Sequence, residues 1–255
     1  MSTNKKEKLN ENKRYSLSDL IKEESKLVLE AENKYKEYWN NAIEFNYLLN
    51  NFIKEAKPEA MFFMLFYSQI KKHHTLAILS IVRKHSIQAY MNMRQVIEST
   101  IGAIYGFHFK DREDFVDKLE DGTIKEKTSF KKGKYKLIQE KYEKHSYFFK
   151  NQKKFINEGP AHSNLIYAFQ NFEFSKDKGF SNLIFDKDDK LMAELILWFV
   201  GNTTLGILDL FREANQNENI ITFVDDFDEK LKKLEENNLK LKEELEKEER
   251  FTKWL

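Results

Sequence analysis

Apolar side chains recur every three or four positions along most of this chain, with few interruptions. From Ser16 to Ala56 there is no glycine or proline, and the apolar positions keep a loose helical spacing. Such periodicity is typical of an amphipathic helix that packs against a core. The pattern therefore predicts a first long helix in this segment, preceded by a polar, mobile stretch over residues 1–15.

The next apolar stretch is too long for a single helix. Pro58 suits the first turn of a helix, and a long run without glycine follows it. One helix over 59–109 would be roughly 75 Å long, far more than a compact bundle of this chain length allows. We therefore expect a break near Ser86, the N-cap of the later helix, and two antiparallel helices, 59–82 and 86–109.

A short hairpin and another helix follow in the last third of the chain. Residues 171–185 alternate apolar and polar side chains around a Lys-Asp-Lys-Gly turn, which predicts a small β-hairpin. Asp188 or Asp189 then caps a strongly apolar helix that runs to about Ala214. Polar residues interrupt its longest apolar run, Leu191–Phe211, so we interpret it as a buried core helix rather than a membrane span.

The end of the chain has a different pattern. Five apolar residues and one asparagine are separated by four and three residues in turn, as along the seam of a coiled coil: Phe227, Leu231, Leu234, Asn238, Leu241 and Leu245. A lone asparagine at an a position, as Asn238 is here, fixes register in two-stranded coiled coils. Two interpretations stay open. One is a coiled-coil tail over 225–255 that binds a second copy or a protein partner through 227–248; the other is a helix that folds back on its own bundle, with Asn238 facing water.

Composition supports the same architecture. Only 8 glycines and 2 prolines occur in 255 residues, while aromatic residues make up 14%, so long helices with a bulky core are expected. We predict an all-α fold: a bundle of about five helices over 16–214, the small hairpin near 171–185, and the C-terminal coiled-coil helix. The absence of cysteine excludes disulfides and cysteine-ligated metals. The first residues lack the apolar core of a secretory signal, so a cytoplasmic protein without membrane contact is expected.

Arg94 and Glu98 are the least expected residues of the predicted helix 86–109. On a helical projection they fall on the same stripe as the apolar Tyr90 and Ile101. A charge on an apolar stripe is costly unless it is paired and hydrogen-bonded. Two roles stay open for these residues: a buried structural ion pair, or a binding pocket in which Arg94 is the anion-binding fork.

The histidines offer limited chemistry. His162 follows Gly-Pro-Ala at a predicted helix start, where exposed N–H groups favour anions and a neutral imidazole. It is therefore a candidate general base, with a hydrogen-bonding loop histidine as the alternative. The others lack metal-ligand spacing, and we interpret them as surface or interface residues: His73, His74, His85, His108 and His145. Phosphate-loop, dinucleotide and serine-hydrolase motifs are absent, so no cofactor and no metal are predicted.

Charge is unevenly distributed although the net charge is only +1. Residues 125–154 contain eleven lysines and three glutamates interleaved with aromatic residues, whereas 111–121 is acidic. Lysines neutralise phosphates without reading sequence, and aromatic rings stack on unpaired bases. The predicted nucleic-acid-binding residues are Lys131, Lys132, Lys134, Tyr135, Lys141 and Lys144. A solvated lysine-rich helix, neutralised by the acidic segment, is the alternative.

One run resembles the central helical hairpin of uncharacterised bacterial helical proteins: LAILSIVRKHSIQAYMNMRQVIESTIGAIYGF. Those proteins carry an Arg-x-x-x-Glu helix and, some tens of residues later, a loop with serine and histidine that opens another helix. Arg94, Glu98, and His162 with Ser163 match these features. Over roughly residues 58–212 the chain is thus similar to the HEPN superfamily. It departs in one respect: the superfamily's nuclease motif is Arg, then four to six residues, then His on one helix, and no Arg here has a His at that spacing.

The resemblance implies a bundle of four to five helices, frequent dimers, metal-independent RNA cleavage, and a role in phage defence or toxin–antitoxin systems. On this interpretation His162 is the catalytic base, with Arg94 and Glu98 in the same site. The leading prediction is therefore an RNA-directed defence component, a metal-independent ribonuclease if it is catalytic. The alternative is a non-catalytic, dimeric helical interaction protein.

Overall fold

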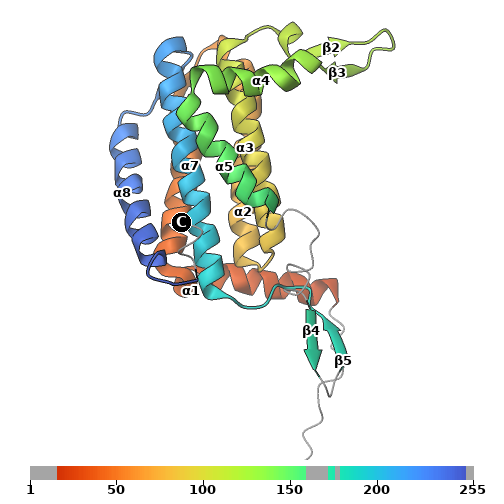
Figure 1. Cartoon of the computed structure of the whole chain (residues 1–255), viewed down its shortest axis with the longest axis vertical. Coiled ribbons are helices and arrows are strands. Elements are labelled where there is room, and N and C mark those ends of the chain that lie inside the picture. The colour runs from red at the N-terminus through yellow and green to blue at the C-terminus, as the bar shows by residue number, and fades with distance from the viewer. Residues whose placement is uncertain (1–15, 159–171, 176–178, 251–255) are drawn as a thin grey trace, which may run out of the picture.

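The computed structural model describes residues 16–158, 172–175 and 179–250, and within these ranges the chain is an all-α bundle (Figure 1). Seven α-helices lie in the described ranges, together with three short two-stranded antiparallel sheets. The predicted all-α fold class is confirmed. The stretch expected to be mobile, 1–15, and the predicted helix start at His162 lie outside the described residues.

Helix α1, Leu17–Asn51, begins at the predicted position. The Ser16 hydroxyl accepts a hydrogen bond from the Asp19 backbone N–H at 3.2 Å, and the Asp19 carboxylate accepts one from the Ser16 backbone N–H at 3.2 Å. This reciprocal capping box satisfies two backbone groups that a helix N-terminus otherwise leaves open. The helix kinks at Lys36, whose φ is 47°, and its first half runs across one end of the bundle (Figure 1).

The segment between the first two helices contains a strand that apolar spacing did not predict. Strand β1, Ile53–Ala56, pairs antiparallel with β6, Ile221–Phe223. A 3-10 turn at Pro58–Ala60 then leads into α2, Met61–Val82. The expectation that the first helix extends to Ala56 is wrong, because the backbone groups of β1 bond to a strand far along the chain instead.

Helices α2 and α3, Ser86–His108, form the predicted antiparallel hairpin. Their backbones approach so closely that a Cβ added at Gly106 would lie 2.6 Å from the backbone nitrogen of Phe63. The break occurs where it was predicted, but Ser86 is the first helical residue and not the N-cap. Its backbone N–H and hydroxyl both donate to Asp186 Oδ2 at 2.6 Å, so a carboxylate distant in sequence closes this helix end.

The basic segment is divided between an arm and two helices (Figure 1). Strand β3, Ile124–Glu126, pairs with β2, Val116–Lys118, in an arm that projects from the bundle. Helices α4, Thr128–Lys141, and α5, Glu143–Glu158, follow. Both pack on α3, and α5 also packs on α7. The lysine-rich sequence is therefore brought beside Arg94 and the rest of α3.

The predicted hairpin is confirmed: β4, Phe172–Ser175, pairs antiparallel with β5, Gly179–Asn182. Helix α7, Lys190–Glu218, starts at the N-cap Asp189, whose carboxylate accepts a hydrogen bond from the Met192 backbone N–H at 3.0 Å. In the described ranges α7 is the one helix long and apolar enough to cross a membrane. Helices α1, α2, α3, α5 and α8 all pack on it, which fits its interpretation as a core helix.

Helix α8, Phe227–Leu245, folds back along the bundle and packs on α1 and α7 (Figure 1). All six residues of the predicted coiled-coil seam are buried within this chain. Asn238 does not face water, because it is only 3% exposed. Its Oδ1 accepts a hydrogen bond from Asn41 Nδ2 at 3.1 Å, and its backbone oxygen accepts one from Trp198 Nε1 at 3.0 Å. A coiled coil with a partner stays a prediction, and it requires that these contacts be displaced.

Candidate nucleic-acid interface

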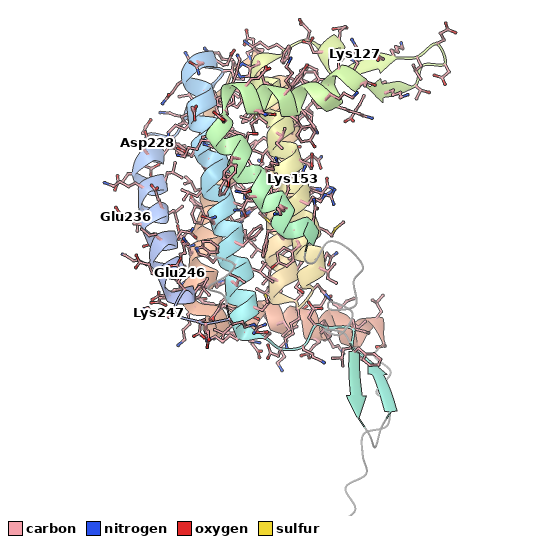
Figure 2. The ribbon with its side chains drawn as sticks, viewed as in Figure 1. Lys127, Lys153, Asp228, Glu236, Glu246 and Lys247 are labelled. Atoms are coloured by element: carbon pink, nitrogen blue, oxygen red, sulfur yellow. The ribbon has the colours of Figure 1, made fainter. Side chains whose placement is uncertain are left out.

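Glu98 of α3 is the centre of a charged cluster formed by three helices. Lys153 of α5 and the Tyr135 hydroxyl of α4 donate hydrogen bonds to its carboxylate, and Lys134 Nζ lies 3.7 Å from Oε2 (Figure 2 labels Lys153). Burial alone raises the pKa of Glu98, but the bonds from Lys153 and Tyr135 outweigh it and bring the pKa below its ordinary value. The carboxylate is therefore ionised at neutral pH and holds α4 and α5 against α3.

The ring of Tyr135 lies between cations. The Nζ atoms of Lys134 and Lys153 are 5.3 and 5.0 Å from its ring centroid, and Lys134 is also 5.3 Å from the ring centroid of Phe130. These distances are typical of cation–π contacts. Burial, and then the hydrogen bond to Glu98, raise the pKa of the Tyr135 hydroxyl. Tyr135 therefore stays protonated and acts as a donor.

Arg94 does not form the expected buried ion pair with Glu98. The buried face of α3 includes Met93 and Ile97, each 0% exposed, while Arg94 and Glu98 lie half-buried at its edge. Ile87, which lies seven residues before Arg94 and therefore on the same side of the helix, is exposed. The projection was therefore out of phase with the real buried face. Glu98 bonds to the two lysines instead, and Arg94 makes no ion pair within the described ranges.

Arg94 nevertheless belongs to the same cluster. Its positive charge lowers the pKa of Tyr135, although burial and the hydrogen bond to Glu98 together raise that pKa. Lys134 and Lys153 both contact the Glu98 carboxylate, and Arg94 lies four residues before Glu98 on α3, so cations outnumber carboxylates in this cluster. The position of charges on an apolar stripe had predicted Arg94 and Glu98 as site residues, and the composition of the basic segment had predicted Lys134 and Tyr135. Lys153 was not predicted individually, although it belongs to the basic segment 125–154.

Helix α5 also presents an exposed basic row, which we call the α5 face: Lys144, Tyr147, Lys150 and Lys154. These residues are spaced three or four positions apart and therefore share one side of the helix. Tyr147 is 69% exposed. No aspartate or glutamate occurs between residues 144 and 157. The α5 face thus combines lysines and an open aromatic ring between the glutamates at the two ends of the helix, Glu143 and Glu158.

The other predicted nucleic-acid-binding lysines are spread along α4. Lys131 lies 3.8 Å from Glu126, and Lys141 Nζ lies 3.4 Å from His108 Nδ1. Lys132 is exposed and makes no ion pair with a described residue. These lysines are therefore not gathered into the Glu98 cluster.

The acidic segment makes few ion pairs with the basic segment. Among described residues, its one ion pair with the basic segment joins Asp117 to Lys127 at 3.6 Å. Lys127 lies beside the arm formed by β2 and β3, where Figure 2 labels it. The projecting arm holds its acidic side chains apart from the α5 face. Among the described residues, no lysine beyond Lys127 forms an ion pair with the acidic segment, and the alternative of a solvated lysine-rich helix stays open.

Several histidines interpreted as surface residues are buried. His74 is 0% exposed, with Nδ1 at 2.9 Å from Asn46 Oδ1 and Nε2 at 2.7 Å from Thr204 Oγ1. Burial lowers the pKa of His74 to about 3, so its ring is neutral. His108 is also largely enclosed and lies 2.8 Å from Glu218. No group of three metal-ligating side chains occurs within the part of the chain that is described.

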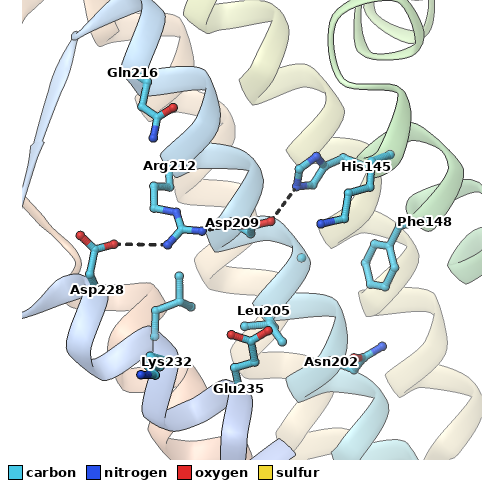
Figure 3. A pocket seen from close by; sticks show the side chains of 13 residues that line it. His145, Phe148, Asn202, Leu205, Asp209, Arg212, Gln216, Asp228, Lys232 and Glu235 are labelled. Carbon is cyan, nitrogen blue, oxygen red and sulfur yellow. Dashed lines mark hydrogen bonds and ion pairs between the residues drawn. The ribbon is translucent and has the colours of Figure 1, made fainter. Parts of the chain in front are cut away.

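A groove of about 820 Å³ runs between α5, α7 and α8 (Figure 3). His145 Nε2 lies 3.2 Å from Asp209, whose other oxygen accepts a hydrogen bond from Arg212 at 2.5 Å. Arg212 reaches Asp228 at 3.4 Å, and His145 Nδ1 lies 3.4 Å from Glu213. Both ring nitrogens of this buried histidine face carboxylates. His145 Nε2 is hydrogen-bonded to Asp209, whereas its Nδ1 is buried without a hydrogen-bond partner.

No protein-family model, curated protein or solved structure matches this chain. The fold and the Glu98 cluster together define this protein as an all-α bundle that carries lysines and tyrosines on the surface of α4 and α5. His162, the predicted base, lies outside the described residues, so the structure does not place it relative to Arg94 and Glu98. The HEPN-like resemblance and its catalytic site stay predictions.

Proposed function

We propose that this protein binds single-stranded RNA through α4 and α5. The observation that carries the proposal is the gathering of Lys134 and Lys153 around the single carboxylate Glu98, on the same helix as Arg94 and next to a helix with an exposed basic face. An excess of cations attracts phosphates, and a guanidinium adds a fork that matches phosphate oxygens. The α5 face extends this positive surface with further lysines.

The aromatic residues favour unpaired strands over duplexes. The ring of Tyr147 is open to solvent, and it offers a stacking surface that only an unstacked base can use. Lysines contact the backbone without regard to sequence. We therefore expect weak sequence preference and strong salt dependence from this surface.

The resemblance to the HEPN superfamily extends the proposal to metal-independent RNA cleavage in a bacterial phage-defence or toxin–antitoxin system. In that reaction Arg94 would stabilise the charge that develops on the phosphate, and His162 would take the proton from the attacking hydroxyl. Glu98 is ionised and already hydrogen-bonded, so its role in the proposal is to hold α4 and α5 on α3, while its charge offsets part of the positive charge that attracts RNA. This structural role replaces the catalytic role first expected for Glu98.

Binding is tested by fluorescence anisotropy with a labelled oligo(U), measured between about 50 and 200 mM salt. The variant Lys144→Ala/Lys150→Ala removes two cations from the α5 face. Lys233→Ala/Lys240→Ala is its matched control, because both of these lysines are exposed on α8. We expect the first variant to lower the salt slope by about 1.4, or 0.7 for each lost contact, and the control to leave it unchanged. Equal slopes for the two variants would refute the proposed surface.

Cleavage is tested separately, by incubating full-length protein with end-labelled RNA in the presence of EDTA. We expect Arg94→Ala and His162→Ala to lose product formation while melting close to the wild-type temperature. RNA that is bound but never cut would restrict the function to binding and would remove the catalytic part of the proposal. Unfolding of Arg94→Ala would instead assign that residue a structural role.

A further inference from the structure

The arm formed by β2 and β3 carries exposed aliphatic side chains at its tip. Leu119 is 44% exposed and Ile124 is 57% exposed. The turn between them is well defined, because the Leu119 backbone N–H donates to the Thr123 oxygen at 2.9 Å. The Asp121 carboxylate also accepts a hydrogen bond from the Thr123 backbone N–H at 2.9 Å. The two aliphatic side chains contribute nothing to the core of the bundle, so the tip is available for a contact with another molecule.

The base of the arm is fixed on the bundle by aromatic packing. Phe115 is 3% exposed, and its ring stacks on Phe62 of α2 with 4.1 Å between the centroids. Tyr105 of α3 and Phe130 of α4 complete this aromatic cluster. The Lys127 backbone N–H donates to the Phe115 oxygen at 2.9 Å. The arm is therefore held in place before any contact forms, which lowers the entropic cost of binding through it.

Charge is separated between the arm and α5. Residues 111–126 contain seven acidic and three basic side chains. Glu113 and Glu120 are exposed and make no ion pair with a described residue. On the α5 face, Lys144 and Lys150 are exposed and likewise have no ion-pair partner within the described ranges. The arm projects from the bundle past α4, so these two surfaces of opposite charge lie apart in one chain (Figure 1).

We propose that the arm of one copy of this protein docks on the α5 face of a second copy and excludes RNA from that face. The opposite charges of the two surfaces attract each other and set their relative orientation. The exposed ring of Tyr147 offers Leu119 and Ile124 an apolar surface beside the lysines. The self-association depends only on the arm and the α5 face, whereas the exclusion of RNA rests on the proposed function.

This contact joins two different surfaces of the chain and is therefore heterologous. It gives a closed pair if each copy places its arm on the other, and an open chain of copies if the contact runs in one direction. Both arrangements leave the seam of α8 buried within its own chain. The contact is thus distinct from the coiled coil predicted for 227–248.

Self-association is measured without RNA, by sedimentation velocity of the full-length protein over a range of concentrations at about 50 mM and about 1 M salt. We expect the sedimentation coefficient to rise with protein concentration at low salt only, because the Debye length at 1 M is about 3 Å. Glu113→Lys/Glu120→Lys and Lys144→Glu/Lys150→Glu should each weaken the association at least about tenfold. An equimolar mixture of these two variants should restore it to within about threefold of the wild type, because each reversed surface then meets its complement.

Glu236→Lys/Glu243→Lys is the matched control, because it changes the net charge by the same amount on the exposed side of α8. We expect it to associate within about threefold of the wild type. Ile124→Ser should weaken the association severalfold and leave the melting temperature unchanged, because this side chain is exposed. Equal weakening by the control and by the arm variant would assign the effect to net charge and overturn the inference.

A protein that stays monomeric at low salt, or a mixture of folded charge variants that does not associate, would also overturn it. The exclusion of RNA is tested by adding excess oligo(U), which should dissociate the assemblies into complexes that contain one copy. Assemblies that persist while oligo(U) is bound would contradict the exclusion. The oligo(U) salt slopes of the lysine variants are measured separately, so the proposed function can fail while the charge-reversal mixture still decides the contact between copies.

Discussion

Replacing Glu98 with glutamine separates the structural role of this carboxylate from its effect on RNA. The substitution keeps the shape of the side chain but removes the charge that holds Lys153 and Tyr135. Hydrogen bonds to a charged group contribute about 1 kcal/mol more than neutral ones. The Glu98 side chain is 23% exposed, so solvent screens part of this difference, and we expect a loss of about 1 kcal/mol. For a chain of this size that lowers the melting temperature by about 2–4 °C.

The same substitution should strengthen RNA binding severalfold, because Lys134 and Lys153 then face no carboxylate. The lowered pKa of Glu98 adds a pH test. Its stabilising contribution is present above its ordinary pKa of 4.5 and is lost as pH falls through the lower folded value, so wild type and variant should converge in stability under acid. Calorimetric melting and anisotropy at neutral pH measure the two effects.

Glu140→Gln is the control for Glu98→Gln. Glu140 pairs with Lys136 at 3.6 Å on the exposed side of α4, so its loss should change stability by less than about 0.5 kcal/mol. If Glu98→Gln weakens RNA binding while the protein stays folded, the cations do not act as a phosphate site. If it leaves stability unchanged, the hydrogen bonds that hold α4 and α5 on α3 contribute nothing, and this part of the reasoning is refuted.

Three further predictions concern the fold. Gly106→Ala should lower the free energy of unfolding by about 3 kcal/mol, because its Cβ would meet the α2 backbone. Gly122→Ala should lower it by about 1 kcal/mol, because Gly122 has a φ of +83° but open space around it. Urea unfolding measures both values. Burial lowers the pKa of His74 to about 3, so between pH 6.5 and about 3 its ring binds a proton only in the unfolded chain. The free energy of unfolding should therefore fall by up to about 1.4 kcal/mol for each unit that the pH drops in this range. His74→Gln should reduce this slope. Deleting 227–255 should expose the bundle and cause aggregation in light scattering; a well-behaved, stable truncated protein would contradict the packing of α8.

Much of the fold was predictable because local chemistry decides it. The glycine-free apolar run made the break before Ser86 necessary, and Asp189 caps α7 as its position suggested. Strand β1 was not predictable, because its partner β6 lies far along the chain and pairing depends on tertiary structure. The same holds for Asp186, which closes the N-terminus of α3 from a distant segment.

The candidate site was only partly predictable. Arg94 and Glu98 stood out as charges among apolar neighbours, but the C-terminal half of α3 is enclosed on every side, so spacing could not fix the phase of its buried face. The seam of α8 shows the same limit. A heptad pattern fits a second chain and the bundle of its own chain equally well, and the buried Asn238 satisfies its hydrogen bonds within this one.

The most direct test of the central claim is photo-crosslinking of full-length protein to an oligonucleotide that contains 4-thiouridine, with the attached peptides identified by mass spectrometry. We predict crosslinks within 128–158, centred on Tyr147 and reduced in Tyr147→Ala. Crosslinks confined to α8 or to the β2–β3 arm, or crosslinks unaffected by that substitution, would show that α4 and α5 are not where this protein holds RNA.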